Sequence, residues 1–365
     1  METENTSFDN QFNAMLNDLV RVTFGDALRA SLKDPRLAGF FLRTIRAQRK
    51  AMALRVAWEK KGVHVPPLMI LSVTQRCNLR CAGCYSQGLH REAGPEMDAT
   101  RLESLLAEAS ELGISNVLLA GGEPLLKPGL LDVTARFPDI IFPLLTNGYL
   151  LDDAAVARLK GQRHVIPMLS LEGFETETDL RRGAGTYAHV CEAMDRLQAA
   201  GIFFGTSITV TRLNYATVTG KAFIDKLLAK GCKAFFYVEY SPVRPGTESL
   251  VPTHEQREGL AMEPFRERFP AVFLSFPGDE KKFGGCLAAG RGFVHVSSAG
   301  DLEPCPFAPY SDASLLRVSL KDALQSGFLR RVRASSGELL EADGGCAIWK
   351  KRGWAQALLA QSKVS

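Results

Sequence analysis

Three cysteines stand close together in the stretch RCNLRCAGCYSQG, which runs from Arg76 to Gly88. Cys77, Cys81 and Cys84 follow a C-x3-C-x2-C spacing. Three thiolates spaced in this way can bind three corners of a [4Fe–4S] cube, and the fourth iron is then open to an exchangeable ligand. Zinc is the alternative, because it is usually held by four protein ligands and His90 lies six residues after Cys84. The spacing favours iron–sulfur chemistry, since zinc sites more often show paired C-x2-C units.

The other cysteines lie further along the chain and differ in their surroundings. Cys286, Cys305 and Cys346 could form a second metal-binding set, whereas Cys191 and Cys232 have no companions and are interpreted as structural. The N-terminal stretch METENTSFDN is acidic and polar, which does not fit a secretory signal. We therefore expect a cytoplasmic protein with reduced thiols rather than disulfides.

Strand-like and helical stretches alternate after residue 67, and this alternation predicts how the cysteines are positioned. Apolar strands linked by helices are typical of a parallel sheet, and six such units predict an α/β fold with a partial (β/α)6 barrel of the TIM type. Sites in such barrels lie at the C-terminal ends of the strands, and Cys77 follows the first strand directly. The predicted strands are 68–74, 116–120, 140–146, 165–171, 203–210 and 234–240.

The regions before and after this barrel have a different character. We predict an N-terminal helical segment at 1–66, the barrel at 67–275, and a small C-terminal module at 276–365 that begins with a β-hairpin turning at Ser298 to Asp301. Residues 29–61 carry ten Lys or Arg residues and only Asp34 and Glu59. This basic stretch is either a solvated helix face packed on the barrel or a peripheral contact with an anionic membrane surface.

The cysteine motif and the strand ends together resemble the radical S-adenosylmethionine (SAM) enzymes. C-x3-C-x2-C is followed by the aromatic Tyr85, and three short motifs close successive predicted strands: GGEP (Gly121 to Pro124), TNG (Thr146 to Gly148) and SLEG (Ser170 to Gly173). RRGAGTY, from Arg181 to Tyr187, resembles a segment found in members with a C-terminal SPASM or twitch module. The resemblance covers about residues 68–350.

This resemblance implies a cofactor set and a reaction. A [4Fe–4S] cluster on Cys77, Cys81 and Cys84 would bind SAM at its open iron, and reductive cleavage would give a 5′-deoxyadenosyl radical that abstracts hydrogen from a substrate. A flavodoxin or ferredoxin would supply the electron. The glycines of GGEP would let backbone approach the SAM amino group, and Ser170 and Glu172 would bind the ribose, although most members carry Asp where Glu172 stands. The residues implied to bind the cofactor are Tyr85, Gly121, Gly122, Glu123, Asn147, Ser170, Glu172 and Arg212.

Later strands supply candidates for substrate chemistry. Arg212 follows the fifth predicted strand and could hold the SAM carboxylate or a substrate anion. Glu239 and Tyr240 end the sixth strand and could move a proton. Ion pairing at the barrel rim is the alternative for these charged side chains.

The C-terminal segment resembles the start of SPASM and twitch modules, which bind an auxiliary [4Fe–4S] cluster. Cys286, Cys305 and Cys346 would be its ligands, but Trp349 occupies the position of the second cysteine in the usual closing C-x2-C. Either the auxiliary cluster has an open iron, or Asp343, His295 or another group supplies the fourth ligand.

Composition limits the possible partners. A net charge of +4 does not indicate nucleic-acid binding, and no apolar run reaches the roughly 18 residues of a membrane span. Three classes of function remain: an enzyme that modifies a peptide or protein side chain, the same machinery acting on a small molecule, lipid or tetrapyrrole, and a non-catalytic zinc-binding protein.

Overall fold

The computed structural model describes residue 25 and residues 35–89, 95–276, 285–339 and 346–362. One nine-stranded sheet dominates it, in the order β7-β6-β5-β4-β3-β2-β1-β8-β9. Neighbouring strands from β7 to β8 run parallel, and only β9 is antiparallel to its neighbour. The strands are β1 Leu68–Thr74, β2 Asn116–Gly121, β3 Phe142–Thr146, β4 Val165–Leu171, β5 Gly205–Val210, β6 Ala234–Glu239, β7 Val272–Phe276, β8 Phe293–Val296 and β9 Leu302–Glu303.

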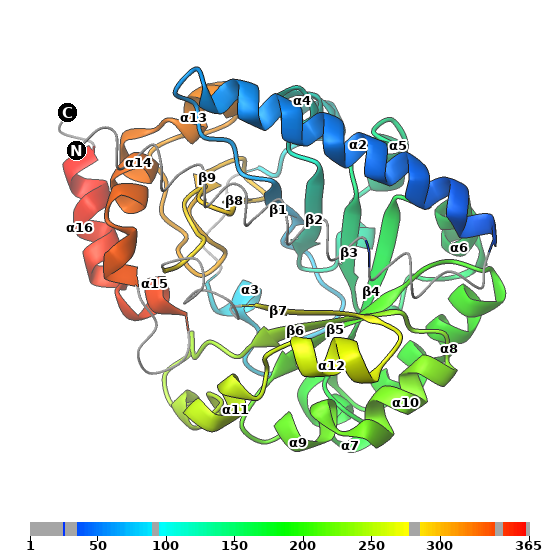
Figure 1. Cartoon of the computed structure of the whole chain (residues 1–365). Helices are drawn as coiled ribbons and strands as arrows, with labels where there is room; N and C mark the ends of the chain where they lie inside the picture. Colours follow the sequence, from blue (N-terminus) through cyan, green and yellow to red (C-terminus); the bar gives the residue numbers. More distant parts are fainter. Residues whose placement is uncertain (1–24, 26–34, 90–94, 277–284, 340–345, 363–365) are drawn as a thin grey trace.

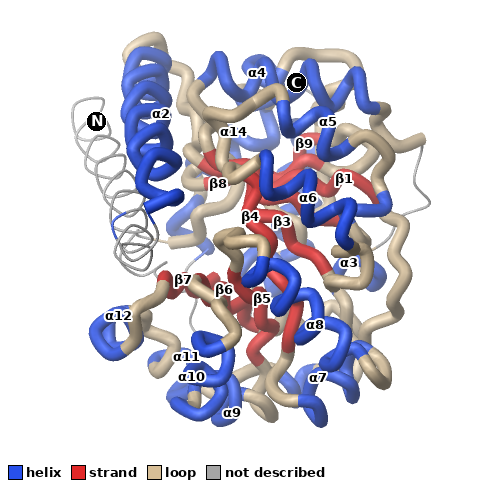
Figure 2. Tube along the Cα trace, turned by 90° about the vertical axis from the view of Figure 1, so that its right-hand side faces the viewer, coloured by secondary structure: helices blue, strands red, loops and turns tan. Residues whose placement is uncertain are grey.

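Helices and short turns link these strands, and most of them lie outside the curved sheet, whereas α3 (Tyr85–Gly88) lies at the middle of the ring (Figures 1 and 2). Six of the strands are those predicted, and the α/β partial barrel is confirmed. The helices are α2 Pro35–Glu59, α3 Tyr85–Gly88, α4 Ala99–Leu112, α5 Leu130–Ala135, α6 Asp153–Gly161, α7 Glu175–Arg182, α8 Thr186–Ala199, α9 Tyr215–Thr219, α10 Lys221–Ala229, α11 His254–Glu258, α12 Glu263–Arg268, α13 Leu320–Leu324, α14 Gly327–Ala334, α15 Ala347–Lys350 and α16 Arg352–Ser362, with 3-10 turns η1 Pro124–Leu126, η2 Glu248–Leu250 and η3 Ser336–Leu339.

The C-terminal segment completes the wall of the barrel. β8 pairs with β1 in parallel, with Leu68 opposite Phe293, and β9 folds back on β8 as the predicted hairpin. The Phe276 ring at the end of β7 lies 5.1 Å from the Phe293 ring, measured between centroids. This contact brings the two sides of the open sheet together. The segment that the sequence assigned to a separate module therefore contributes a strand to the barrel itself.

Helix α2 lies along the outside of the barrel beside α4 (Figure 1). Its Arg55 is buried and donates to the Gly113 carbonyl at 2.6 Å, while Gln48 donates to the Ser115 carbonyl at 3.3 Å. Gly113 ends α4 with φ +89°, and a Cβ there would lie 2.5 Å from the Ala51 carbonyl oxygen of α2. Part of the basic stretch thus packs on the barrel, while a membrane contact stays a prediction. Among the described residues, no helix has the length and apolarity needed to cross a membrane.

Candidate active site

A large cavity opens at the C-terminal ends of the strands, where the parallel barrel places its loops. Its mouth is open to solvent. Most of the predicted site residues line it, namely Cys77, Cys81, Cys84, Tyr85, Gly121, Gly122, Glu123, Asn147, Ser170, Glu239 and Tyr240. Segments far apart in the sequence therefore meet around one space, as their positions at strand ends predict.

The two glycines of GGEP allow β2 to end against the start of the cysteine loop. Gly121 has φ +129°, and a Cβ on it would lie 2.2 Å from the Thr74 carbonyl oxygen. A Cβ on Gly122 would lie 2.1 Å from the Arg76 carbonyl oxygen. The backbone N–H groups of Gly122 and Glu123 donate to these same two carbonyls, at 2.7 and 2.8 Å. The close approach that requires glycine here is between two protein backbones.

The Glu123 carboxylate joins β2, β3 and the cysteine loop. It accepts hydrogen bonds from the Thr146 hydroxyl at 2.9 Å and from the Asn147 backbone N–H at 2.8 Å. Asn147 in turn donates its side-chain amide to Asn78, between Cys77 and Cys81, at 2.7 Å. Burial raises the pKa of Glu123, and the hydrogen bonds that it accepts offset this only in part. GGEP and TNG thus act together to fix the cysteine loop.

A second carboxylate, Glu96, holds the beginning of that loop. It accepts from the Thr74 hydroxyl at 2.7 Å and the Gln75 backbone N–H at 2.9 Å, and its other oxygen pairs with Lys127 at 3.1 Å. Burial alone would raise the pKa of Glu96, but these three donors outweigh burial and hold that pKa below its ordinary value. Neither Glu96 nor Lys127 belongs to a motif in the sequence, so only their positions in the fold reveal this role.

Replacing Glu96 with Gln is expected to destabilise the protein by about 1–2 kcal/mol near neutral pH, because a charged acceptor for three donors is lost. A carboxylate with a lowered folded-state pKa stabilises the fold above its unfolded pKa, and that contribution disappears as pH falls through the folded value. The difference between the variant and the unaltered protein should therefore shrink between about pH 6 and about pH 3.5. Urea unfolding of both proteins at about pH 6 and at about pH 3.5 measures this difference in the free energy of unfolding. The same change at the exposed Glu111 is the control, and an equal difference at both pH values would contradict the assignment.

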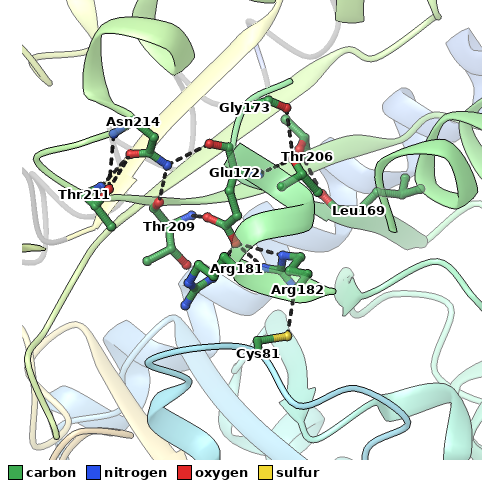
Figure 3. A network of polar contacts seen from close by, with 11 residues as sticks. Cys81, Leu169, Glu172, Gly173, Arg181, Arg182, Thr206, Thr209, Thr211 and Asn214 are labelled. Carbon is green, nitrogen blue, oxygen red and sulfur yellow. Dashed lines mark hydrogen bonds and ion pairs between the residues drawn. The ribbon is translucent and has the colours of Figure 1, made fainter. Parts of the chain in front are cut away.

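Glu172 is 1% exposed and is not among the residues that line the cavity. Figure 3 shows its contacts. One oxygen pairs with Arg181 and Arg182 of α7, and the other accepts from the Thr209 backbone N–H at 3.1 Å. The guanidinium of Arg182 approaches Glu172 through two nitrogens, at 2.8 and 2.5 Å. Since these partners occupy the Glu172 carboxylate, the side chain orients the two arginines, which do line the cavity.

Arg181 and Arg182 were not among the predicted site residues, although they begin the RRGAGTY segment that is part of the family resemblance. They form the last turn of α7 and point back toward the cysteine loop (Figure 3). Arg182 places one nitrogen 3.9 Å from the Cys81 sulfur. Burial alone would lower the pKa of Arg182, but the Glu172 carboxylate and the Cys81 thiol outweigh burial and raise that pKa. A basic pair in a cavity can bind a carboxylate.

Three further candidates lie at the ends of β5 and β6. Arg212 is outside the cavity lining, and its Nε donates to the Val251 carbonyl at 3.2 Å at the exposed rim. Glu239 is 3% exposed and lies 3.7 Å from Arg257. The Tyr240 hydroxyl is buried against Gly83 of the cysteine loop and has no hydrogen-bond partner among the described residues. Glu239 and Tyr240 thus stay candidates for moving a proton, and Arg212 lies beside the site.

The three C-terminal cysteines are buried, and Cys305 lies next to this cavity. Exposed fractions are 4% for Cys286, 2% for Cys305 and 8% for Cys346. Pro306 and Phe307, directly after Cys305, line the cavity, and the Phe307 ring lies 5.1 Å from that of Tyr85. Cys305 therefore adjoins the part of the cavity wall that contacts Tyr85.

His295 is not available as the fourth ligand of an auxiliary cluster, and that alternative was wrong. Its Nε2 lies 2.8 Å from the Ser72 hydroxyl of β1 and its Nδ1 lies 2.8 Å from Glu303 of β9, so both ring nitrogens have partners within the sheet. His90 and Asp343 lie outside the described residues. Trp349, at the position of the missing cysteine, donates its indole N–H to the Pro242 carbonyl at 3.2 Å.

The first three cysteines fit an iron–sulfur cluster. They come from one short loop, are half-buried, and face the same cavity, which has room for a further ligand. Thiolates are the usual ligands of iron–sulfur clusters. Within the described parts of the chain, no three His, Cys, Asp or Glu side chains converge on a single point as one bound ion would require.

Comparison with known proteins agrees with this geometry. Residues 71–218 match the model of the radical SAM superfamily. Among curated proteins, mycofactocin maturase MftC of Mycobacterium ulcerans is 28% identical over 68% of this chain and 70% of its own length. PqqA peptide cyclase of Gluconobacter oxydans is 28% identical over 66% of this chain and 70% of its own. AdoMet-dependent heme synthase of Methanosarcina barkeri is 23% identical over 79% of this chain and 90% of its own.

Solved structures give the same fold. Streptococcus suis SuiB bound to precursor peptide SuiA superposes with a TM-score of 0.60 at 19% identity, covering 76% of this chain and 68% of SuiB. The segment matched by the family model begins in β1 and ends in α9, so it contains the three cysteines and all the strand-end motifs that surround the cavity. Residues 71–218 are therefore a radical SAM domain, and the chain is an enzyme whose cofactors are a [4Fe–4S] cluster and S-adenosylmethionine.

Proposed function

We propose that this enzyme modifies a side chain of a ribosomally made peptide or of a protein, as a maturase. One observation carries the proposal: three thiols of one loop face a cavity that is open at the barrel mouth and has room for a cofactor and a substrate group. The name of PqqA peptide cyclase and the precursor peptide in the SuiB structure support a peptide as the substrate, and the name of MftC supports a maturase.

In this proposal Cys77, Cys81 and Cys84 hold the [4Fe–4S] cluster and the neighbouring residues hold SAM. When bound, the cluster supplies the electron for reductive cleavage of SAM. Arg181 faces the cavity as a cation suited to the carboxylate of SAM. The Ser170 hydroxyl, at the end of β4, is suited to the ribose. Glu123 is committed to the loops and acts by fixing the cysteine loop.

The floor of the cavity suggests what part of the substrate reacts. Inward-facing side chains of the strands below the cysteine loop are mainly apolar, namely Ile70, Leu118, Leu145, Phe236, Val238 and Phe276. Placing a charged group on such a floor without a partner would cost several kcal/mol. The group presented for hydrogen abstraction is therefore expected to be uncharged, such as an aliphatic or aromatic side chain.

A second candidate function is the same chemistry on a small molecule such as a tetrapyrrole. The alignment with the heme synthase supports it, because that alignment covers more of both chains than the alignments with MftC and PqqA peptide cyclase do. An apolar floor would suit the macrocycle substituents of a tetrapyrrole as well as a peptide side chain.

We also propose an auxiliary [4Fe–4S] cluster on Cys286, Cys305 and Cys346. Their burial, and the position of Cys305 next to the cavity-lining Pro306, suit a cluster that accepts an electron from a substrate-derived intermediate. A flavodoxin or ferredoxin would reduce the SAM-binding cluster.

Deuterium transfer tests the proposed function and separates the two substrate classes. Reconstituted enzyme is incubated anaerobically with reductant, SAM and candidate substrates deuterated at aliphatic or aromatic positions, and 5′-deoxyadenosine is analysed by mass spectrometry. Deuterium from a peptide is the expected result. Deuterium from a porphyrin and from none of the peptides would replace the maturase proposal with the second candidate.

A further inference from the structure

Arg182 makes a contact that the binding of SAM does not explain. Its guanidinium is held on one side by Glu172, and its remaining nitrogen, Nη1, points at the sulfur of Cys81 at 3.9 Å (Figure 3). The side chain is 11% exposed, so water screens its charge little. A buried cation therefore lies directly beside one of the three thiols proposed to bind the cluster.

The position of the Arg182 guanidinium depends on Glu172, which Thr209 and Asn214 hold in place. Thr209 of β5 donates its backbone N–H to one Glu172 oxygen, and the Asn214 side chain donates to the Glu172 carbonyl at 2.8 Å. The other Glu172 oxygen engages Arg182 through two nitrogens. This two-point contact fixes the plane of the guanidinium, so its free nitrogen has a defined direction.

A fixed cation beside a thiolate ligand has a known physical effect on an iron–sulfur centre. Reduction adds negative charge to the cluster, and hydrogen bonds to the sulfurs together with nearby positive charge stabilise that state. Both effects raise the reduction potential. They are strongest where burial keeps the local dielectric constant low.

We propose that Arg182, oriented by Glu172, is a positioning residue that donates to the Cys81 sulfur and raises the reduction potential of the SAM-binding cluster. The inference rests on the proposed cluster at Cys77, Cys81 and Cys84. It gives Glu172 a role that differs from ribose binding: the carboxylate determines the distance between a cation and a cluster ligand. It also distinguishes the two arginines of RRG: Arg182 contacts the Cys81 sulfur, and Arg181 faces the cavity.

The test is an EPR-monitored redox titration of the full-length, anaerobically reconstituted enzyme, following the signal that changes when SAM is added. R182Q is expected to shift the midpoint of that signal to a more negative potential at unchanged iron content. E172D, which keeps both charges but shortens the carboxylate arm by one methylene, is expected to shift it in the same direction by less. R182K keeps the positive charge but lacks the planar guanidinium, so its midpoint potential is expected to lie between those of R182Q and the unaltered enzyme.

R181Q is the matched control, because Arg181 shares the Glu172 partner and the charge, whereas the contact with the Cys81 sulfur comes from Arg182. A clearly smaller shift in R181Q supports the proposal. Equal shifts in R181Q and R182Q would overturn it, because net charge alone would then explain them, and an unchanged midpoint in R182Q would overturn it directly. If the unaltered protein forms no cluster at all, the proposed function fails, and this inference fails with it.

Discussion

Replacing Cys77, Cys81 and Cys84 together with Ala is expected to abolish the formation of 5′-deoxyadenosine. The three thiols come from one loop and face the same cavity, so the variant loses every cysteine ligand proposed for the SAM-binding cluster. Without that cluster no electron reaches SAM. Anaerobic reconstitution followed by iron, sulfide and 5′-deoxyadenosine analysis measures the outcome, with iron falling to about half if the auxiliary cluster survives.

Two control variants separate this effect from general damage. Replacing Cys286, Cys305 and Cys346 with Ala should also lower iron by about half but leave SAM cleavage detectable. Replacing Cys191 and Cys232 should change neither, since Cys232 is 1% exposed and burial raises its pKa to about 12, which keeps it an unreactive thiol. Persistent 5′-deoxyadenosine in the first variant would show that SAM binds elsewhere. Unchanged iron in the second would reject the auxiliary cluster.

Replacing Gly122 with Ala should destabilise the barrel mouth and prevent stable cluster binding. The added Cβ would lie 2.1 Å from the Arg76 carbonyl oxygen, which is backbone and cannot rotate away. Relieving the clash must separate β2 from the cysteine loop and weaken the hydrogen bond from Glu123 N–H to Arg76. We expect a loss of about 3 kcal/mol in unfolding free energy and a marked loss of iron. Thermal or urea unfolding of the iron-free protein and iron analysis after reconstitution measure the two effects.

Gly161 provides the matched control for this substitution. It ends helix α6, and a Cβ there would meet nothing within 4 Å. Alanine at this site should leave iron binding unchanged and alter stability by at most about 1 kcal/mol, in the stabilising direction. If Gly122→Ala behaves like Gly161→Ala, the close contact between β2 and the cysteine loop does not determine the site.

Local patterns in the sequence were enough to predict the six central strands and the residues that meet at their ends. Apolar strands separated by helices leave little choice but a parallel sheet, and a parallel sheet gathers its C-terminal ends at one mouth. Cys77, Gly121, Asn147 and Ser170 could therefore be placed together without coordinates. Helix capping is also local: Ser319 is the N-cap of α13 and accepts from the Asp322 backbone N–H at 3.2 Å.

Side-chain partners between distant segments could not be predicted in this way. Glu172 looked like a ribose ligand until its oxygens were found engaged by Arg181, Arg182 and Thr209. His295 looked like a metal ligand until the pairing of β8 with β1 and β9 placed it between Ser72 and Glu303.

The sequence by itself determined the chemistry and its place: three thiols in one loop at the mouth of a parallel barrel, with strand-end motifs around them. The tertiary structure alone decided which charged groups are free to face the cavity and which are committed to one another. The difference lies in how far apart in the sequence the interacting residues are. Strand and helix patterns follow from neighbours a few residues apart, whereas the partner of a buried charge comes from another part of the fold. Only the tertiary structure shows that Glu172 holds Arg182 against Cys81.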